Sequence, residues 1–169
     1  MNPSYCRIRT PLDDALERFA AWQGLPQVGP LVAASSSTAI DLACDERGNW
    51  RGQAVFVSEM PGWTLFQDLS GGLGYIPAEE WLKYSGTDEL VFASYNDAIS
   101  YGELVAISNG VILREFRQDR YSPDVNVNLG HLGDEHEPLR TWVEVASFME
   151  ADKLSFSNEG FLWIYRPSQ

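Results

Sequence analysis

The segment that decides the fold reads ELVAISNGVILREF and spans residues 103–116. Two aliphatic, β-branched runs flank the dipeptide Asn109-Gly110, which favours the type I′ turn between antiparallel strands. We therefore predict a β-hairpin with strands at 103–108 and 111–116. The rest of the sheet is assigned outward from this hairpin.

Other short runs rich in β-branched and aromatic residues predict further strands. Pro61-Gly62 separates two of these runs and indicates a tight reversal, so 53–60 and 63–69 are expected to pair antiparallel. Residues 27–37 are rich in Pro, Gly and Ser and are expected to form a connecting loop or an irregular edge segment. The remaining predicted strands lie at 39–44, 89–95, 154–156 and 161–165.

Three segments have the apolar spacing of helices. The first follows Thr10-Pro11 and ends before Gly24, the second begins at Pro77 and ends near Gly86, and the third covers residues 139–151. Strands and helices in this order predict an α+β fold. We expect one or more antiparallel sheets of about eight short strands, with the three helices packed on one side.

Length and composition predict one globular domain over residues 1–169, because six Trp, eight Phe and seven Tyr can supply a core. No run approaches the roughly 18 apolar residues that a membrane-spanning helix needs. Residues 1–10 lack the apolar core of a signal peptide. We therefore expect a cytoplasmic protein in which Cys6 and Cys44 are buried thiols, although their spacing leaves a disulfide open.

The net charge of −12 is unevenly distributed along the chain. Between Gly52 and Leu113 lie eight carboxylates and a single cation, Lys83. Residues 119–137 add five carboxylates against Arg120. A large field of one sign favours a cationic partner and would repel the phosphates of a nucleic acid. We expect a basic protein as the partner, and neither nucleic acid nor a membrane.

Two segments combine tyrosines with carboxylates outside the predicted strands and helices. One is the turn 95–103, and the other is a long loop at 121–138. Tyrosine gives a large contact area at low entropy cost, which is typical of recognition surfaces, whereas an Asx turn with packed tyrosines is the structural alternative. The predicted partner-binding residues are Tyr95, Asp97, Tyr101, Glu103, Asp119, Tyr121, Asp124, Asp134, Glu135 and Glu137.

Catalytic and metal chemistry have weaker signals. His131 and His136 are not spaced like zinc ligands, and the glycine-rich run 70–74 lacks the lysine of a phosphate-binding loop. A hydrolase that uses carboxylates around Asp68 and Asp97 is one alternative to a binding protein, because glycoside hydrolysis needs only two acids about 5 to 10 Å apart. An adaptor or scaffold is another. We predict no catalytic residue, no metal and no cofactor.

Three runs carry a resemblance to a known class of protein. They are GWTLFQDLSGG (62–72), DELVFASYNDA (88–98) and YGELV (101–105). The chain resembles small acidic bacterial proteins associated with polymorphic toxins, mainly over residues 62–116 and around Trp142. In that setting such proteins are immunity proteins, which are cytoplasmic, non-enzymatic inhibitors that bind a cognate toxin domain.

The resemblance implies a function for the acidic surface. An immunity protein of an Rhs-type effector, a class linked to type VI secretion, blocks the active site of the toxin domain. The toxin would be a nuclease, an ADP-ribosyltransferase or another effector that acts on nucleotides or nucleic acids. Carboxylates would stand in its basic cleft where phosphates bind, with Tyr95, Tyr101, Tyr121 or Trp63 as the aromatic anchors.

Overall fold

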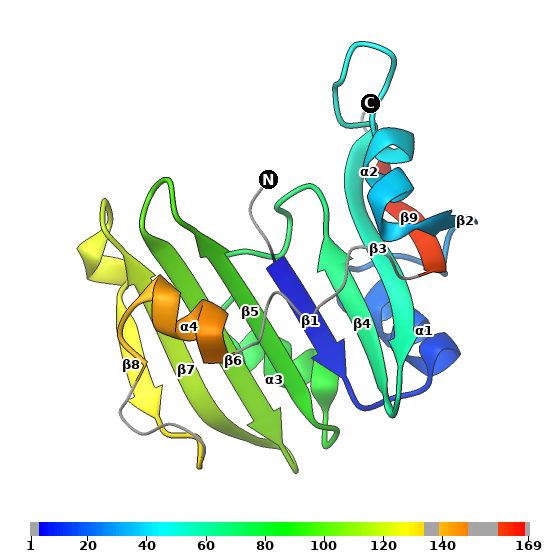
Figure 1. The fold of residues 1–169 in the computed structure, drawn as a ribbon. Coiled ribbons are helices and arrows are strands. Elements are labelled where there is room, and N and C mark those ends of the chain that lie inside the picture. The colour runs from blue at the N-terminus through cyan, green and yellow to red at the C-terminus, as the bar shows by residue number, and fades with distance from the viewer. Residues whose placement is uncertain (1–3, 134–138, 149–158, 168–169) are drawn as a thin grey trace.

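The computed structural model describes residues 4–133, 139–148 and 159–167. Within these ranges the chain forms strands, helices and one short 3₁₀ helix (Figure 1). The strands are β1 (Ser4–Ile8), β2 (Leu31–Ser35), β3 (Gly52–Met60), β4 (Trp63–Asp68), β5 (Leu90–Asn96), β6 (Tyr101–Ser108), β7 (Val111–Asp119), β8 (Val127–Gly130) and β9 (Glu159–Pro167). The helices are α1 (Leu12–Trp22), α2 (Ser36–Ala43), α3 (Ala78–Ser85), α4 (Trp142–Phe148) and the 3₁₀ helix η1 (Pro123–Val125).

All the described strands belong to one antiparallel sheet. Their order is β2-β9-β3-β4-β1-β5-β6-β7-β8, so β1 is the central strand and β2 and β8 are the edges. The hairpin of β6 and β7 is confirmed, because Asn109 and Gly110 have φ values of 51° and 72°, as a type I′ turn requires. The predicted reversal at Pro61-Gly62 is confirmed by the pairing of β3 with β4.

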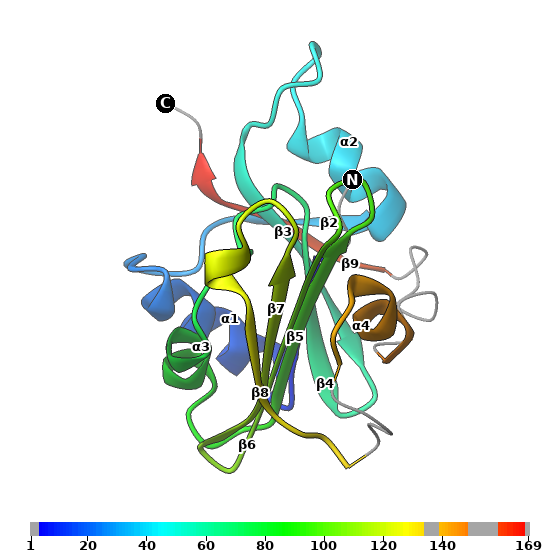
Figure 2. The ribbon, with the colours of Figure 1, turned by 90° about the vertical axis from the view of Figure 1, so that its left-hand side faces the viewer.

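Helices cover both faces of the sheet. Helices α1 and α3 pack on one face, where Cys6, Phe92 and Val105 belong to the largest cluster of buried apolar side chains. Helix α4 packs on the other face, over Ala93 and Leu104. Figure 2 shows α1 and α3 on one side of the sheet and α4 on the opposite side. Helix α2 also lies on the α4 face, over β3 and β9.

The α+β class with an antiparallel sheet is confirmed, but the prediction that the helices pack on one side is wrong. The reason can be read from the run Leu104-Val105-Ala106-Ile107, in which every side chain is buried. Successive side chains of a strand point to opposite faces, so a continuous apolar run needs a cover on each face. The third predicted helix, at 139–151, supplies that second cover as α4.

Residues 27–44 differ from the prediction in two ways. Within 27–37, predicted as a connecting loop or an irregular edge segment, residues 31–35 form the regular edge strand β2, and the predicted strand 39–44 is the end of helix α2. Helix α2 forms because Ser35 and Thr38 make a capping box, in which the Thr38 amide donates to Ser35 Oγ at 3.3 Å. Ala39 and Ala43, four residues apart, then form one buried helix face.

Two strands lie where none was predicted. Strand β1 contains Arg7 among apolar residues, and β8 is only four residues long and lies within the predicted loop 121–138. Neither has a long β-branched run, so their strand character depends on the neighbours that they pair with. The predicted strand 154–156 lies outside the described residues. None of the described helices is long and apolar enough to cross a membrane. Cys6 and Cys44 are free thiols, of which Cys6 is buried and Cys44 half-buried.

Candidate functional site

Three segments meet at one end of the sheet, and we call this region the tyrosine corner. It consists of residues 97–100, which turn from β5 into β6, residues 119–126, which lead from β7 through η1 toward β8, and Tyr75 from the loop before α3. Tyr101 and Asp119 pair across β6 and β7, so the first two segments lie at the same end (Figure 1). This corner gathers most of the described residues that were predicted to bind a partner.

A buried ion pair lies beneath the corner. Glu103 is fully buried, and Arg117, its cross-strand neighbour, donates from Nη2 to Glu103 Oε1 at 2.8 Å. The Tyr75 amide donates to Glu103 Oε2 at 3.1 Å, and the Tyr101 hydroxyl donates to the same oxygen. Burial raises the pKa of Glu103, and these donors oppose the rise. The carboxylate therefore joins β6, β7 and the Tyr75 loop in one hydrogen-bonded unit.

A second carboxylate, Asp119, fixes the segment 119–126. It accepts hydrogen bonds from the Tyr75 hydroxyl at 2.8 Å and from the amides of Tyr121 at 2.8 Å and Ser122 at 3.1 Å. The Asp119 amide in turn donates to Asn126 Oδ1 at 2.6 Å, which closes the segment. The Tyr75 bond, followed by the two amides, holds the pKa of Asp119 below its usual value.

Tyr75 carries local backbone strain. Its φ of 63° is uncommon for a bulky residue, and Ser100, in the adjacent turn, has a φ of 50°. Tyr75 is held at its amide by Glu103, at its hydroxyl by Asp119, and along its ring by stacking on Tyr101 at 4.7 Å. Burial, and then the bond to Asp119, raises the pKa of Tyr75 to about 12. Strained residues fixed by several contacts are typical of functional sites.

The corner presents apolar and acidic side chains to solvent. Tyr121 is 71% exposed although its own amide is held by Asp119, and Val125 and Ile99 are each 37% exposed. Asp97 and Asp124 are exposed, and neither carboxylate has a side-chain partner among the described residues. The exposed aromatic side chain therefore lies on a segment whose backbone is already ordered.

The predicted binding residues separate into three groups. Those that the structure leaves accessible are Tyr95, Asp97, Tyr121 and Asp124, with Tyr95 half-buried against Trp142 of α4 at 6.5 Å between ring centres. Tyr101, Glu103 and Asp119, which were also predicted to contact a partner, are buried and hydrogen-bonded within the fold, where they support the accessible residues. Asp134, Glu135 and Glu137 lie outside the described residues.

The residues that sequence reasoning missed are Tyr75, Arg117 and Asn126. Each holds the tyrosine corner by a hydrogen bond, either to a residue distant in the sequence or to a backbone amide. None of the three belongs to a sequence motif. One signal for this network was present in the sequence. Tyr101 and Glu103 are two residues apart on one strand and so share a face, and a Glu buried there needs a cation beside it. That signal points to Arg117 only after the strand register is known.

The negative charge is not confined to the corner. Asp88, in the turn after α3, pairs with Arg18 of α1 at 2.6 Å, and Glu80 pairs with Lys83 within α3 at 2.5 Å. Four other carboxylates on these helices have no ion pair within the described part of the chain, and they are Asp13, Asp14, Glu17 and Glu79. The α1–α3 face is thus a second acidic surface, on the opposite face of the sheet from α4.

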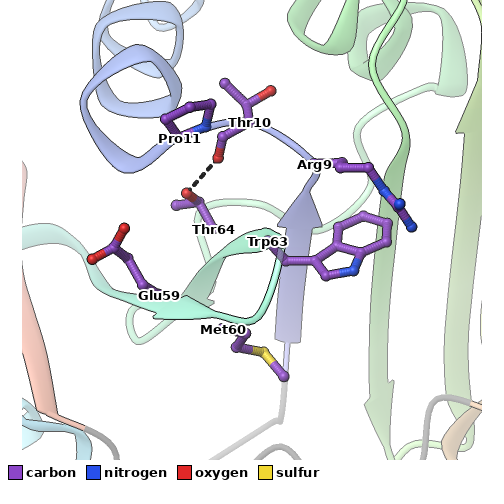
Figure 3. Close-up of a pocket in the computed structure, with 8 residues that line it drawn as sticks. Arg9, Thr10, Pro11, Glu59, Met60, Trp63 and Thr64 are labelled. Atoms are coloured by element: carbon purple, nitrogen blue, oxygen red, sulfur yellow. Dashed lines mark hydrogen bonds between the residues drawn. The ribbon is translucent and has the colours of Figure 1, made fainter.

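Trp63, a predicted aromatic anchor, lies at the far end of the sheet from the corner. It borders a hollow of about 420 Å³ (Figure 3). The guanidinium groups of Arg9 and Arg7 lie 4.8 Å and 5.1 Å from the centre of its ring, and Arg9 also pairs with Glu89 at 2.8 Å. Two cations beside the indole make this an unfavourable place for a basic partner.

Asp68, one half of the carboxylate pair in the hydrolase alternative, has a structural role. It is buried, and its oxygens accept from the amides of Ser70, Gly71, Gly72 and Leu73 at 2.8 to 3.2 Å. Burial raises the pKa of Asp68, and these amides oppose the rise. The carboxylate closes the loop that carries Tyr75, whereas Asp97 is exposed. Both Asp68 oxygens therefore already accept backbone hydrogen bonds that hold this loop.

Among the described residues, no three His, Cys, Asp or Glu side chains gather as a metal site requires. His131 is exposed, and His136 lies outside the described ranges. Comparisons with protein-family models, with curated proteins and with solved structures gave no match. The function is therefore argued from the residues of the tyrosine corner.

Proposed function

We propose that this chain is a non-catalytic inhibitor of the immunity type, which acts in the cytoplasm and binds a basic toxin domain through the tyrosine corner. One observation carries the proposal. Tyr121 is largely exposed, yet the buried Asp119 fixes its backbone, and unpaired carboxylates lie in the same two segments. A fixed aromatic side chain beside unpaired acids is suited to the rim of a basic cleft.

Preorganisation is the first reason that this geometry favours binding. Ordering a loop on association lowers affinity, because the loop loses conformational freedom. At the corner that ordering is already supplied by Asp119, Asn126 and Tyr75. Tyr121 then acts as an anchor without a further loss of backbone entropy. Tyr is also among the residues most often found to dominate binding energy.

Charge is the second reason. Within the described ranges, Asp97 and Asp124 face solvent without an ion pair, and the α1–α3 face adds further carboxylates that are unpaired there. Such a field accelerates encounter with a basic protein, and rim charges act mainly on the association rate. Fast capture suits an inhibitor that must neutralise a toxin before it turns over. We expect the tyrosine corner to provide specificity and the negative potential of the wider surface to raise the association rate.

The proposal requires a toxin domain encoded beside this gene, and the test is protection of cells from that domain. Cells that co-express the toxin domain and the wild-type chain should survive, and the purified pair should form a complex. Tyr121→Ala combined with Asp124→Lys should abolish protection and weaken binding by about 100-fold. Val111→Ala is a matched control, since Val111 is 56% exposed but lies at the β6–β7 turn, away from the corner.

Two outcomes would count against the proposal. The first is that the corner variant, shown to be folded by its circular dichroism spectrum, protects as well as the wild type. The second is that capture from the native cell at low salt recovers no basic protein. The second result would favour the adaptor alternative, in which no toxin is bound.

A further inference from the structure

The sheet edge opposite the tyrosine corner carries an apolar hollow. It encloses about 530 Å³ between edge strand β2, helix α2 and strand β9. Leu162 is buried and Ile164 half-buried, while Val32 and Leu42 are exposed. The lining residues are Pro30, Val32, Leu42, Arg51, Leu162 and Ile164. A volume of this size lies in the range of sites that hold small organic molecules.

Among the described residues that line this hollow, Arg51 is the one with a polar side chain. Its amide donates to the Ala43 carbonyl and its Nε donates to the Cys44 carbonyl, each at 2.9 Å. These two bonds anchor the side chain at the end of α2. Neither terminal guanidinium nitrogen has a partner among the described residues. The guanidinium is therefore held in place with two donors left for a ligand, and such a planar fork matches a carboxylate.

A neighbouring anion, Asp45, is already engaged in its own turn. Asp45 lies close enough to Arg51 to feel its charge, but it forms no ion pair with it. Its Oδ1 accepts from the amides of Arg47 at 2.8 Å and Asn49 at 2.9 Å, and its Oδ2 accepts from the Asn49 side chain at 3.1 Å. Asp45 thus closes its own turn and leaves the Arg51 fork available.

We propose that this hollow binds an aliphatic monocarboxylate of medium chain length. The carboxylate would bind the terminal nitrogens of Arg51 in a bidentate pair, and the chain would cover Val32, Leu42 and Leu162. Arg51 beside apolar lining residues favours a ligand with one carboxylate and one apolar chain. Because the hollow and the tyrosine corner lie at opposite edges of the sheet, this site is independent of the proposed inhibitor function.

The test is a titration of the whole chain with hexanoate, octanoate and decanoate below their micelle concentrations, followed by methyl NMR. Shifts should concentrate on Val32, Leu42, Leu162 and Ile164. Affinity should rise about fourfold for each added methylene that is buried. Octylammonium, which has the same chain and the opposite charge, should bind at least tenfold more weakly than octanoate.

Variants of two neighbouring arginines separate the site from general surface binding. Arg51→Gln should weaken octanoate at least tenfold, and Arg51→Lys should restore part of the loss, because lysine keeps the charge without the fork. Arg47→Gln is the matched control, since Arg47 is exposed in the same turn but does not line the hollow, and it should leave affinity unchanged. Equal affinity of wild type and Arg51→Gln, or shifts spread equally to Val111 and Leu129, would overturn the proposal.

Discussion

The two edges of the sheet hold their exposed side chains by different means. At the β7–β8 edge, Tyr121 is positioned by a network of buried charges that includes Asp119, Glu103 and Arg117. At the β2 edge, Arg51 is positioned by two neutral backbone carbonyls at the end of α2. The stability of the first edge should therefore respond more strongly to mutation and pH than the stability of the second edge.

The largest expected effect comes from breaking the buried ion pair. Glu103→Ala leaves the Arg117 guanidinium without its carboxylate, and removing one member of a buried pair destabilises a protein by about 3 to 5 kcal/mol. Urea denaturation should show this loss, whereas Arg51→Gln should change the free energy of unfolding by about 0.5 kcal/mol or less. A Glu103→Leu, Arg117→Met double variant should recover much of the loss. Equal stability of Glu103→Ala and Arg51→Gln would remove the proposed contrast.

A smaller effect is expected at the strained tyrosine. Tyr75→Phe removes the bond to Asp119 but keeps the ring stacked on Tyr101, and one such bond contributes about 1 kcal/mol. The amide of Tyr121 should then exchange its hydrogen faster, because Asp119 has lost one of its anchors. The amide of Arg51 serves as the reference at the other edge and should exchange at its wild-type rate. Unchanged exchange at Tyr121 would show that Tyr75 does not order the segment 119–126.

The pH dependence sharpens the same contrast. Asp119 has a pKa held below its usual value, so its stabilising contribution is complete above the ordinary pKa of an aspartate and is lost as the pH falls through the lowered value. Tyr75 acts in the opposite direction, because its pKa is raised to about 12 and its contribution fades between about pH 10 and that value. NMR of the Tyr121 and Ser122 amides should report both changes. Asp119→Asn should remove the acid change, and Tyr75→Phe the alkaline one.

The smallest effect is expected from ionic strength on binding. Asp97→Lys and Asp124→Lys each reverse a rim charge, so each should slow association with a basic domain several-fold at low salt and much less at 0.5 M salt. Stopped-flow mixing measures this directly. Glu46→Lys, in an exposed turn at the other edge, changes the net charge by the same amount and should slow association less. Rates that do not depend on salt for any variant would contradict electrostatic steering.

How far the sequence predicts the fold depends on whether its signals are local. The hairpin at Asn109-Gly110 and the reversal at Pro61-Gly62 were predicted because each turn needs only its own residues. Strand β1 was missed, although it is the central strand, because its stability comes from pairing with β4 and β5. The predicted strand at 39–44 is helical because the helix begins at the capping box of Ser35 and Thr38, which lies before the apolar run.

The candidate site shows the same limit. The sequence identified Asp97, Tyr121 and Asp124, which the structure places on the surface of one corner. It did not distinguish them from Glu103 and Asp119, because the sequence does not show which acidic residues are buried in the fold. The distinction needs the register between β6 and β7 and the position of Tyr75, both of which join residues far apart in the chain.

The measurement that tests the central claim most directly is a hydrogen-exchange footprint of the chain bound to the basic toxin domain that the proposed function requires. The account predicts added protection at residues 97–100 and 119–126, with β2 and α2 exchanging as in the free chain. The amide of Tyr121 should show the largest gain, because its side chain is the proposed anchor. Protection confined to the α1–α3 face, with the tyrosine corner unchanged, would contradict the account.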